Sequence, residues 1–294
     1  MRQYITCYFK KFGIGNESLS TVLGYLEKVS AQDFERLRAI YTLEYPIKLE
    51  QMENLLNQIV EKTLLIKRQV NLLGVLCLLQ VLETRLVNKS VPREIIDNTI
   101  IDAVYKMKEC KRVYGYEGLM QFSWFKAILE ERCFGIGRLQ FEIEEFRLER
   151  YEKDGNLVVK GQPSLSVHIP GSGKEFSEKA CKDAYRGAVA FFKKFFPNVF
   201  SGAIAFTSWT WLLWPNNNLI MNENSNILRF QKDFDIIEED LYKTNDSIAW
   251  RIFGVEKIEE VDTLPENTNL QKKAKEYIKN GNLLGWGFGV FFMV

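Results

Sequence analysis

Apolar side chains recur every three or four positions through the first 120 residues of the chain. This spacing puts them on one face of an α-helix. Five helices are predicted, over residues 19–26, 34–41, 52–65, 70–86 and 95–107. Turn-forming segments separate them, at 13–16 before the first helix, at Tyr45-Pro46 after the second and at 88–92 before the fifth. We therefore expect an all-helical N-terminal domain over residues 1–115, with a packing or lid role.

The periodicity changes after this domain. Residues 124–129 indicate one more amphipathic helix, ended by Gly135-Ile136-Gly137. Beyond it, apolar and polar residues alternate as they do in a β-strand. The phase of the apolar positions shifts within residues 138–150, which predicts a strand with a bulge near Glu144 and Glu145.

A strand, a glycine loop and a helix are predicted in succession within residues 164–197. Apolar and polar residues alternate over 164–169, and Pro170 ends the strand. Ser177 offers a cap for a helix that Pro197 stops. Such a unit turns backbone N–H groups and a positive helix end toward one point, which is a ready place for a phosphate group.

The loop in this unit contains Gly171 and Gly173, which give the backbone freedom for a tight turn. It is not a Walker loop, because His168 stands at the first glycine position and Glu175 replaces the serine or threonine. An ATP or GTP site is therefore excluded. A Gly-Ser-Gly sequence after a strand also occurs as a plain turn, so both interpretations stay open at this point.

The remaining residues predict an α/β second half with mixed strand direction. Asp154-Gly155-Asn156 is a hairpin turn. Residues 202–208 form a strand that follows a helical crossover and is therefore expected to lie parallel to 165–169. Further elements are predicted as a strand over 227–237, helices over 247–253 and 270–278, and a strand over 283–293.

Composition and charge limit the possible partners. The chain has 294 residues, enough for two domains, and 46% of them are hydrophobic and 26% charged, as in ordinary globular proteins. The 39 basic and 38 acidic residues nearly cancel, which argues against nucleic acid or an anionic membrane as the partner. The most apolar segment, 70–82, is shorter than a membrane span and is interpreted as a buried helix.

Cysteine and histidine usage narrows the chemistry further. The five cysteines are scattered and lack C-x-x-C spacing, which argues for the reducing cytoplasm and against a disulfide framework or a zinc site. No secretory signal is apparent at the N-terminus. The single histidine, His168, rules out a metal site built from several histidines, so no metal is expected. The oligomeric state is not readable from the sequence.

Five stretches, in order, resemble a family of bacterial two-domain acyltransferase-like proteins. In that family a helical N-terminal domain precedes a GNAT-like C-terminal domain. The stretches are Gly137-Arg138-Leu139-Gln140-Phe141, His168-Ile169-Pro170 with its loop and helix, a tryptophan motif similar to S-W-L-L-x-P with Thr210 at the serine position, residues 225–231, and Leu264-Pro265 with Thr268, Leu270 and Gln271. The resemblance covers residues 116–294, which we take as the second domain. The helical half resembles the family in general character.

The resemblance implies a GNAT fold, in which acyl-coenzyme A lies in a V between two parallel strands. Residues 165–169 and 202–208 would be these strands, and Gly171 to Lys174 the loop that holds the pyrophosphate. The cofactor-binding residues implied are Val167, Ile169, Gly171, Ser172, Gly173, Lys174, Ser208 and Trp211. The usual GNAT signature [QR]-x-x-G-x-[GA] is replaced here by H-I-P-G-S-G, which puts cofactor binding rather than the fold in question.

Acyl transfer to an amine needs a base, and an acid for the departing thiolate. His168, on the polar face of its strand, is a candidate base or carbonyl ligand, and its alternative is a structural histidine bonded to the loop. Glu142 and Glu144 are candidate bases through water, or solvated surface residues. Tyr185 is a candidate acid, or a core residue. Trp209, Trp211 and Trp214 form a ligand platform or pack the core.

The sequence thus predicts a two-domain protein that transfers an acetyl or other acyl group from acyl-coenzyme A to an amine on a small molecule or peptide. The alternative is a catalytically inactive GNAT-fold protein that binds a ligand or a protein partner. The missing glycine signature favours this alternative.

Overall fold

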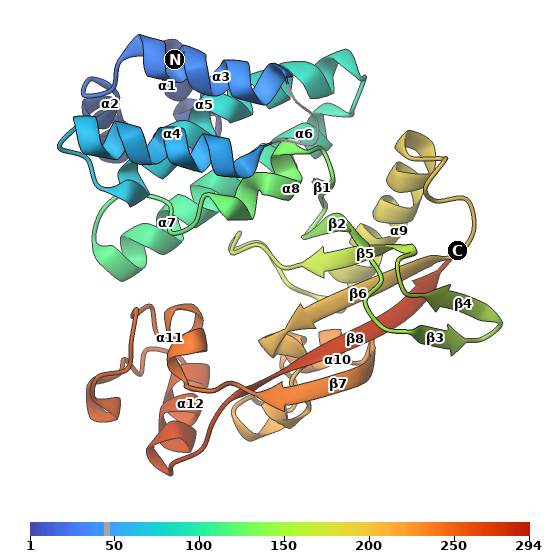
Figure 1. The fold of residues 1–294 in the computed structure, drawn as a ribbon. Helices are drawn as coiled ribbons and strands as arrows, with labels where there is room; N and C mark the ends of the chain where they lie inside the picture. Colours follow the sequence, from blue (N-terminus) through green and yellow to red (C-terminus); the bar gives the residue numbers. More distant parts are fainter. Residues whose placement is uncertain (44–47) are drawn as a thin grey trace. The chain divides into compact units, whose positions relative to one another are not determined.

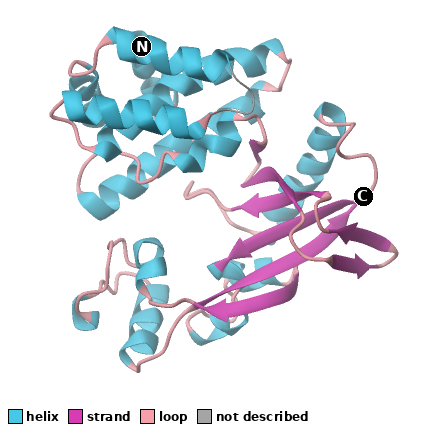
Figure 2. Ribbon diagram, in the orientation of Figure 1, coloured by secondary structure: helices cyan, strands magenta, loops and turns pink. Residues whose placement is uncertain are grey.

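The structure is a computed structural model that describes residues 1–43 and 48–294. The chain divides into two compact units, Met1–Gly135 with Pro170–Ser172, and Ile136–Ile169 with Gly173–Val294. Figure 2 shows helices alone over most of the first unit and the strands in the second. The predicted turn at Tyr45-Pro46 lies outside the described residues. The boundary after Gly115 stays a prediction, because a division by contacts does not test which segments fold alone.

The first unit is helical, as predicted. Its helices are α1 Arg2–Lys11, α2 Asn16–Leu26, α3 Ala31–Leu43, α4 Leu49–Lys62, α5 Lys67–Asn88, α6 Arg93–Ile100, α7 Asp102–Tyr114, the 3-10 turn η1 Ser123–Phe125 and α8 Lys126–Leu129 (Figure 1). The pattern missed α1, whose buried Ile5, Tyr8 and Phe9 have helical spacing. It merged α6 with α7, which are separated at Ile101.

Helix α5 is the core of this unit. It packs against α2, α3, α4, α6 and α7, and its buried side chains run from Val70 to Leu86. Among the described residues, α5 is the one helix that is long and apolar enough to cross a membrane. Most of its apolar stretch is buried inside the protein, as expected for the central helix of a folded unit. The prediction of a buried helix is confirmed.

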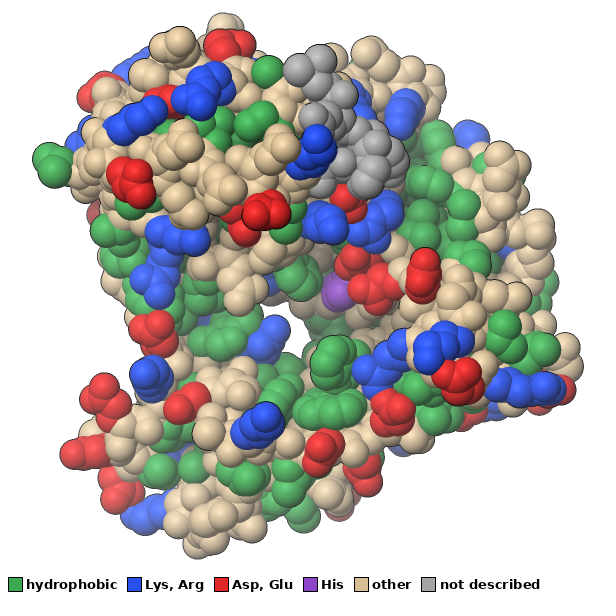
Figure 3. All heavy atoms as spheres, viewed as in Figure 1, with side chains coloured by type: hydrophobic (Ala, Val, Ile, Leu, Met, Phe, Trp, Pro, Cys, Tyr) green, Lys and Arg blue, Asp and Glu red, His purple; other side chains and the backbone are tan. Residues whose placement is uncertain are grey.

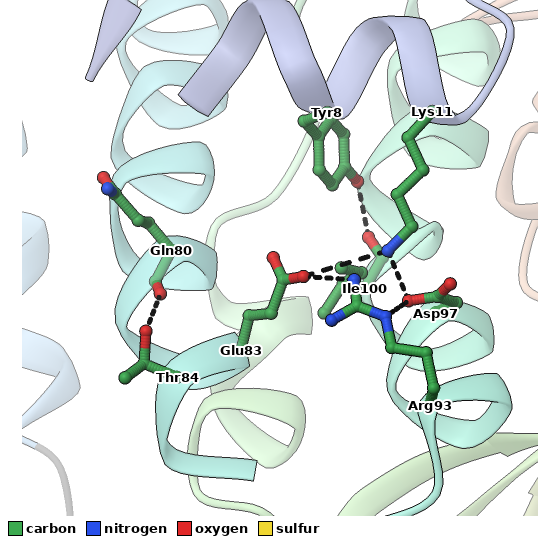
Figure 4. Close-up of polar contacts among 8 residues, drawn as sticks. All are labelled: Tyr8, Lys11, Gln80, Glu83, Thr84, Arg93, Asp97 and Ile100. Atoms are coloured by element: carbon green, nitrogen blue, oxygen red, sulfur yellow. Dashed lines mark hydrogen bonds and ion pairs between the residues drawn. The ribbon is translucent and has the colours of Figure 1, made fainter. Parts of the chain in front are cut away.

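Ion pairs fasten the first helix to this core. Figure 4 shows the Lys11 and Arg93 side chains, from α1 and α6, each between the carboxylates of Glu83 and Asp97. The Tyr8 hydroxyl donates a hydrogen bond to the Ile100 carbonyl. These contacts join α1 to α5 and α6, which lie much later in the sequence.

Gly135 belongs to a strand instead of the predicted helix-ending turn. A Cβ atom at this position would lie 2.2 Å from the Asn98 carbonyl oxygen, so the glycine permits a close approach of two backbones. The Gly135 N–H donates a hydrogen bond to the Thr99 hydroxyl at 2.9 Å. The glycine therefore has a packing role, which the sequence pattern does not distinguish from a turn.

The strands form a six-stranded sheet that belongs to the second unit except for residues 133–135 of its first strand. Its order is β1 Cys133–Ile136, β2 Leu139–Glu145, β5 Pro163–His168, β6 Ile204–Thr210, β8 Gly285–Met293 and β7 Asp235–Leu241 (Figure 1). The β5 and β6 strands are parallel, as predicted, and are joined through helix α9 Glu178–Phe195. The other helices are α10 Asn226–Gln231, α11 Asp246–Ile252 and α12 Asn269–Lys279, with 3-10 turns η2 Trp211–Leu213, η3 Pro215–Leu219 and η4 Val261–Thr263.

The predicted bulge at Glu144 and Glu145 is wrong. The β2–β5 ladder runs without a shift to the pair Glu145↔Pro163, where β2 ends. The phase of the apolar residues changes because β2 ends, and Phe146 and Leu148 lie in the link that follows it. This link leads into the hairpin of β3 Arg150–Lys153 and β4 Asn156–Val159. Its turn has positive φ at Asp154 and Gly155, as the sequence predicted.

The strand predicted over 227–237 is also wrong in its first half. Residues Asn226–Gln231 are helix α10, and β7 begins at Asp235. The Ser225 hydroxyl accepts a hydrogen bond from the Ile227 N–H, which caps the helix. The helices predicted over 247–253 and 270–278 and the strand over 283–293 are confirmed as α11, α12 and β8.

Each face of the sheet has its own apolar cluster. On one face, rings of Phe141, Phe206 and Phe291 surround Tyr185 of α9. On the other, the β3–β4 hairpin contributes to a cluster of Phe146, Tyr151, Val158, Ala205, Phe288 and Val290. This cluster does not include the C-terminal ends of β5 and β6, where the side chains are polar.

Candidate active site

The two parallel strands part after a short ladder. Along β5 and β6, both fully described, the ladder pairs Leu165 with Phe206 and Ser166 with Thr207 and then stops. One position further, the buried Ser208 hydroxyl donates a 2.9 Å hydrogen bond to the Val167 carbonyl. A side chain therefore replaces the backbone ladder where the strands separate.

His168 lies at the end of β5, just beyond this separation. Its Nε2 atom is 3.0 Å from Oε2 of Glu142, and the two side chains are 23% and 17% exposed. An ionised carboxylate can only accept a hydrogen bond, so against such a carboxylate Nε2 is the donor of this contact. Figure 3 shows the purple histidine atoms beside red acidic side chains. The pair has the arrangement of a base held by a carboxylate.

The neighbours of this pair follow from the strand register. Residues paired across a ladder point to the same face, so the rows Gln140↔His168 and Glu142↔Ser166, with Thr207 opposite Ser166 on β6, share one face. Gln140, Ser166 and Thr207 are buried. The sheet thus presents a row of polar side chains where its centre strands part.

Glu144 lies on the same face but further from His168. It is exposed, and its Cα partner is Ser164, which precedes His168 by four residues on β5. The structure therefore brings Glu142 and His168 together and leaves Glu144 outside this contact.

The tryptophans separate into two groups. Trp214 is 2% exposed and packs edge-on against Tyr277, and Trp211 packs against the same core cluster. Trp209 is 63% exposed and contacts Trp286 edge-on. Trp214 is therefore a core residue, Trp211 is half-buried against the same cluster, and Trp209 is the most exposed of the three. Contacts of Trp211 with the cofactor stay a prediction.

Arg147 extends the surface around Trp209. Its guanidinium lies 5.1 Å from the Trp209 ring and 4.1 Å from the Phe288 ring, and it pairs with Glu238. Burial lowers the pKa of Arg147 from its usual range. Sequence analysis missed Arg147 because it lies in the link after β2, where no periodicity marks it.

Comparison with known proteins identifies the fold. Residues 133–291 match the GNAT-like C-terminal domain family, which is more than half of the chain. The chain belongs to this family. No curated protein matches the chain by sequence.

Solved acyltransferase structures resemble the whole chain. A structure with decanoyl-CoA has 19% identity and a TM-score of 0.67, and covers 98% of both chains. A structure with decanoyl-CoA and teicoplanin has 17% identity and a TM-score of 0.66, and covers 99% of both. A mutant acyltransferase with octanoyl-CoA has 16% identity, a TM-score of 0.67 and the same coverage. The likeness shows the same fold, a helical domain followed in the chain by a GNAT-like domain.

The loop expected to hold pyrophosphate in a GNAT-like domain spans the division of the chain. Pro170–Ser172 belongs to the helical unit, and Gly173 and Lys174 to the sheet unit. Gly173 has a φ of +66°, which favours glycine. Within the helical unit, a Cβ atom on Gly171 would lie 3.0 Å from Oε1 of Glu109. An acidic side chain therefore lies beside the first half of this loop.

The helix after the loop begins as predicted. The Ser177 hydroxyl accepts a hydrogen bond from the Ala180 N–H at 3.3 Å, and Glu178 is in the first turn. The cap occupies one of the N–H groups that a phosphate would otherwise meet. Cofactor contacts at this end stay a prediction.

Three other predicted site residues lie inside or at the edge of the core. Tyr185 is 1% exposed, and burial raises its pKa far above the usual range, which favours the core role over that of an acid for the thiolate. Val167 is buried beside Phe141, its Cα partner. Ile169 follows the end of β5 and is half-buried. Their roles in catalysis or cofactor binding remain predictions.

Gln140 is a further polar residue of the site, and the sequence gives it no role beyond its place in the Gly137–Phe141 stretch that resembles the family. It is 1% exposed, and it shares the polar phase of β2 with Glu142 and Glu144. That phase is the signal that could have found it, since three polar residues alternate with Leu139, Phe141 and Ile143.

Proposed function

We propose that the protein is an acyltransferase that moves an acyl group from acyl-coenzyme A to an amine acceptor. The observation that carries the proposal is the 3.0 Å contact of His168 with Glu142, at the end of the strand where β5 and β6 part. Family membership supports it, as do the similar structures with decanoyl-CoA and octanoyl-CoA.

The reaction needs one proton to be moved at each end. The acceptor nitrogen attacks the thioester carbon and forms the C–N bond, and Nδ1 of His168 takes the proton of the amine. The C–S bond then breaks, and coenzyme A leaves as a thiolate. The imidazolium of His168 gives up the proton that it took from the amine, the thiolate is protonated to the thiol, and the base is regenerated with no net change in protons. General base catalysis of this kind contributes a factor of about 10² to 10⁴.

Glu142 acts through His168. Its carboxylate holds the proton on Nε2, which fixes the ring orientation and keeps the lone pair on Nδ1. When Nδ1 takes a proton, the carboxylate also stabilises the imidazolium that forms. We assign Glu142 a positioning role, and we give Glu144 and Tyr185 no step.

The acceptor class is a small molecule or peptide that carries an amine. One similar acyltransferase was solved with teicoplanin, which supports a small-molecule acceptor here. Trp209, exposed on the face that carries His168, would contact an apolar or ring-bearing part of the acceptor. The coenzyme would meet the loop from Gly171 to Lys174, and Ser172 and Lys174 are its polar side chains. We place the reaction in the cytoplasm, because all five cysteines are free.

The test is ligand-induced stabilisation of the purified protein. Unfolding temperature is measured with coenzyme A, acetyl-CoA, decanoyl-CoA and ATP, since a ligand at a hundredfold excess over its dissociation constant adds about 2.7 kcal/mol. A rise with the coenzyme A compounds and none with ATP is expected. No rise with any of them would overturn the proposal and favour the inactive binding protein, for which Glu109 beside Gly171 is the supporting observation.

A second step separates binding from transfer. Free thiol is measured while acetyl-CoA or decanoyl-CoA is incubated with 2-phenylethylamine, hexylamine or a lysine-containing peptide. Thiol release that depends on an amine supports a transferase. Binding without release from any donor and acceptor pair would support a protein that binds acyl-coenzyme A without transferring the acyl group.

A further inference from the structure

A carboxamide without a partner is buried in the sheet. Gln140 is 1% exposed, and neither Oε1 nor Nε2 has a hydrogen-bond partner among the residues that the structure describes. A buried amide with both groups unsatisfied destabilises the unliganded fold. Such a group calls for an explanation other than packing, since an apolar side chain of similar size would suit a purely structural position better.

The strand register places this amide beside the proposed base. Gln140 on β2 is the Cα partner of His168 on β5, and paired side chains on one face have Cβ atoms about 4.5–5.5 Å apart. Glu142, which holds the histidine, is two positions along the same face. The imidazole is therefore flanked by a carboxylate that is bonded to it and by an amide that bonds to no described residue.

We propose that Gln140 is a substrate-binding residue at the reacting centre. The inference rests on the proposed acyl transfer. During that reaction, the carbon under attack carries an oxyanion and a nitrogen that still bears hydrogen. A carboxamide presents a donor and an acceptor side by side, so Nε2 donates to the oxyanion while Oε1 accepts from the N–H of the attacking nitrogen. The hydrogen-bond partners that the Gln140 carboxamide lacks in the protein are thus supplied by the reacting substrates.

The proposal predicts that removing the Gln140 amide does not lower the unfolding temperature but does lower kcat. Replacing Gln140 by leucine or methionine removes the unsatisfied amide, so the unfolding temperature stays the same or rises. Loss of a donor to the oxyanion lowers kcat by a factor of about 10² to 10³, with the dissociation constant of coenzyme A unchanged. Gln140→Asn keeps an amide on a shorter side chain and is expected to lose less activity than Gln140→Leu.

The matched control is Asn71 in the helical unit. It is 2% exposed, and its Oδ1 also has no partner within the described part of the chain. Asn71→Leu makes a similar change in a helix without any proposed chemistry. It should leave kcat unchanged. Lower stability with an unchanged kcat in both Gln140→Leu and Gln140→Met would mean a structural role and would overturn the proposal.

A spectroscopic measurement needs no acceptor. The carbonyl carbon of bound [1-¹³C]acetyl-CoA should resonate downfield of the free compound, because a hydrogen bond from Nε2 polarises the carbonyl. The downfield shift should shrink in Gln140→Leu and persist in Asn71→Leu. Equal shifts in the wild type and in Gln140→Leu would refute the contact and leave the proposed function standing. A wild-type protein that binds no acyl-coenzyme A would refute both.

Discussion

The hydroxyl of Ser208 bonds to the carbonyl of Val167 one position beyond the last paired row of β5 and β6. The bond crosses the opening between the strands at 2.9 Å and is buried. Ser208 was expected to donate to the cofactor, and its hydroxyl hydrogen is used here within the sheet. The bond sets how far apart the strands are where they begin to separate.

Ser208→Ala tests this role. The change leaves the buried Val167 carbonyl without its donor, and the unfolding free energy is expected to fall by about 1–3 kcal/mol. Urea unfolding followed by far-UV circular dichroism measures the loss. The affinity for coenzyme A should also change, because the opening that would receive it is no longer fixed.

Ser164→Ala is the matched control for this experiment. Its hydroxyl bonds to the Glu144 carbonyl at 3.2 Å, within the β2–β5 ladder and away from the opening. It should lower stability without changing coenzyme A affinity. An unchanged affinity in Ser208→Ala would show that the bond matters for the fold alone.

The pair of His168 and Glu142 predicts graded losses of activity. His168→Gln removes the base and should lower the single-turnover rate of thiol release by about 10² to 10⁴. Glu142→Gln keeps the contact but removes the charge that stabilises the imidazolium, so a smaller loss is expected. Glu145→Gln, an exposed neighbour at the end of β2, serves as the control. Equal rates in wild type and His168→Gln would rule out the histidine as base.

Asp235 predicts a pH-dependent contribution to stability. Hydrogen bonds from Lys153 and Tyr151 lower the pKa of Asp235 below its usual value of 3.8. The stabilisation is therefore fully present above pH 4 and is lost as the pH falls through the lowered pKa. Because the carboxylate is 41% exposed, solvent screening limits it to about 1 kcal/mol.

The measurement for Asp235 compares unfolding free energies of the wild type and Asp235→Asn between pH 3 and pH 7. The difference should be present at pH 7 and shrink toward pH 3. A difference that does not change with pH would contradict a charge-dependent link between the β3–β4 hairpin and β7.

The cysteines predict one reactive thiol in the folded protein. Burial raises the pKa of Cys77, Cys110 and Cys181 to about 11, so these thiols are protonated and shielded at pH 8. Cys133 is buried as well, and Cys7 is exposed. Ellman's reagent should therefore titrate one thiol rapidly in native protein and all five after denaturation. Cys7→Ser should remove the rapid phase; its persistence would show that a buried cysteine becomes accessible.

Sequence patterns were most informative where a local signal and a long-range pattern agreed. Ser177 caps α9 as predicted, and the small apolar strand after it lies parallel to β5, because the crossover rule leaves few alternatives. Ser225 caps α10 in the same way, but the apolar run after it predicts a strand. Short apolar runs do not distinguish a buried strand from one helical turn.

The kinds of residues in the candidate site could be predicted from the sequence, but which of them contact each other could not. The polar phase of β2 and the position of His168 at a strand end were visible in the sequence. Which of Glu142 and Glu144 meets the histidine depends on the β2–β5 register, and a difference of two residues in register changes the answer. The partner of Ser208 depends on how the strands diverge, for which the sequence carries no signal.

The central place of α5 has a consequence for synthesis of the chain. On the ribosome α1 to α4 emerge first, so the helices that cover much of α5 are already outside the exit tunnel when this membrane-length apolar segment appears. The order of the helices in the chain thus shortens the time for which this apolar segment is exposed to solvent. A circular permutant that begins at α5 reverses the order, and it should yield more aggregated protein than the natural order.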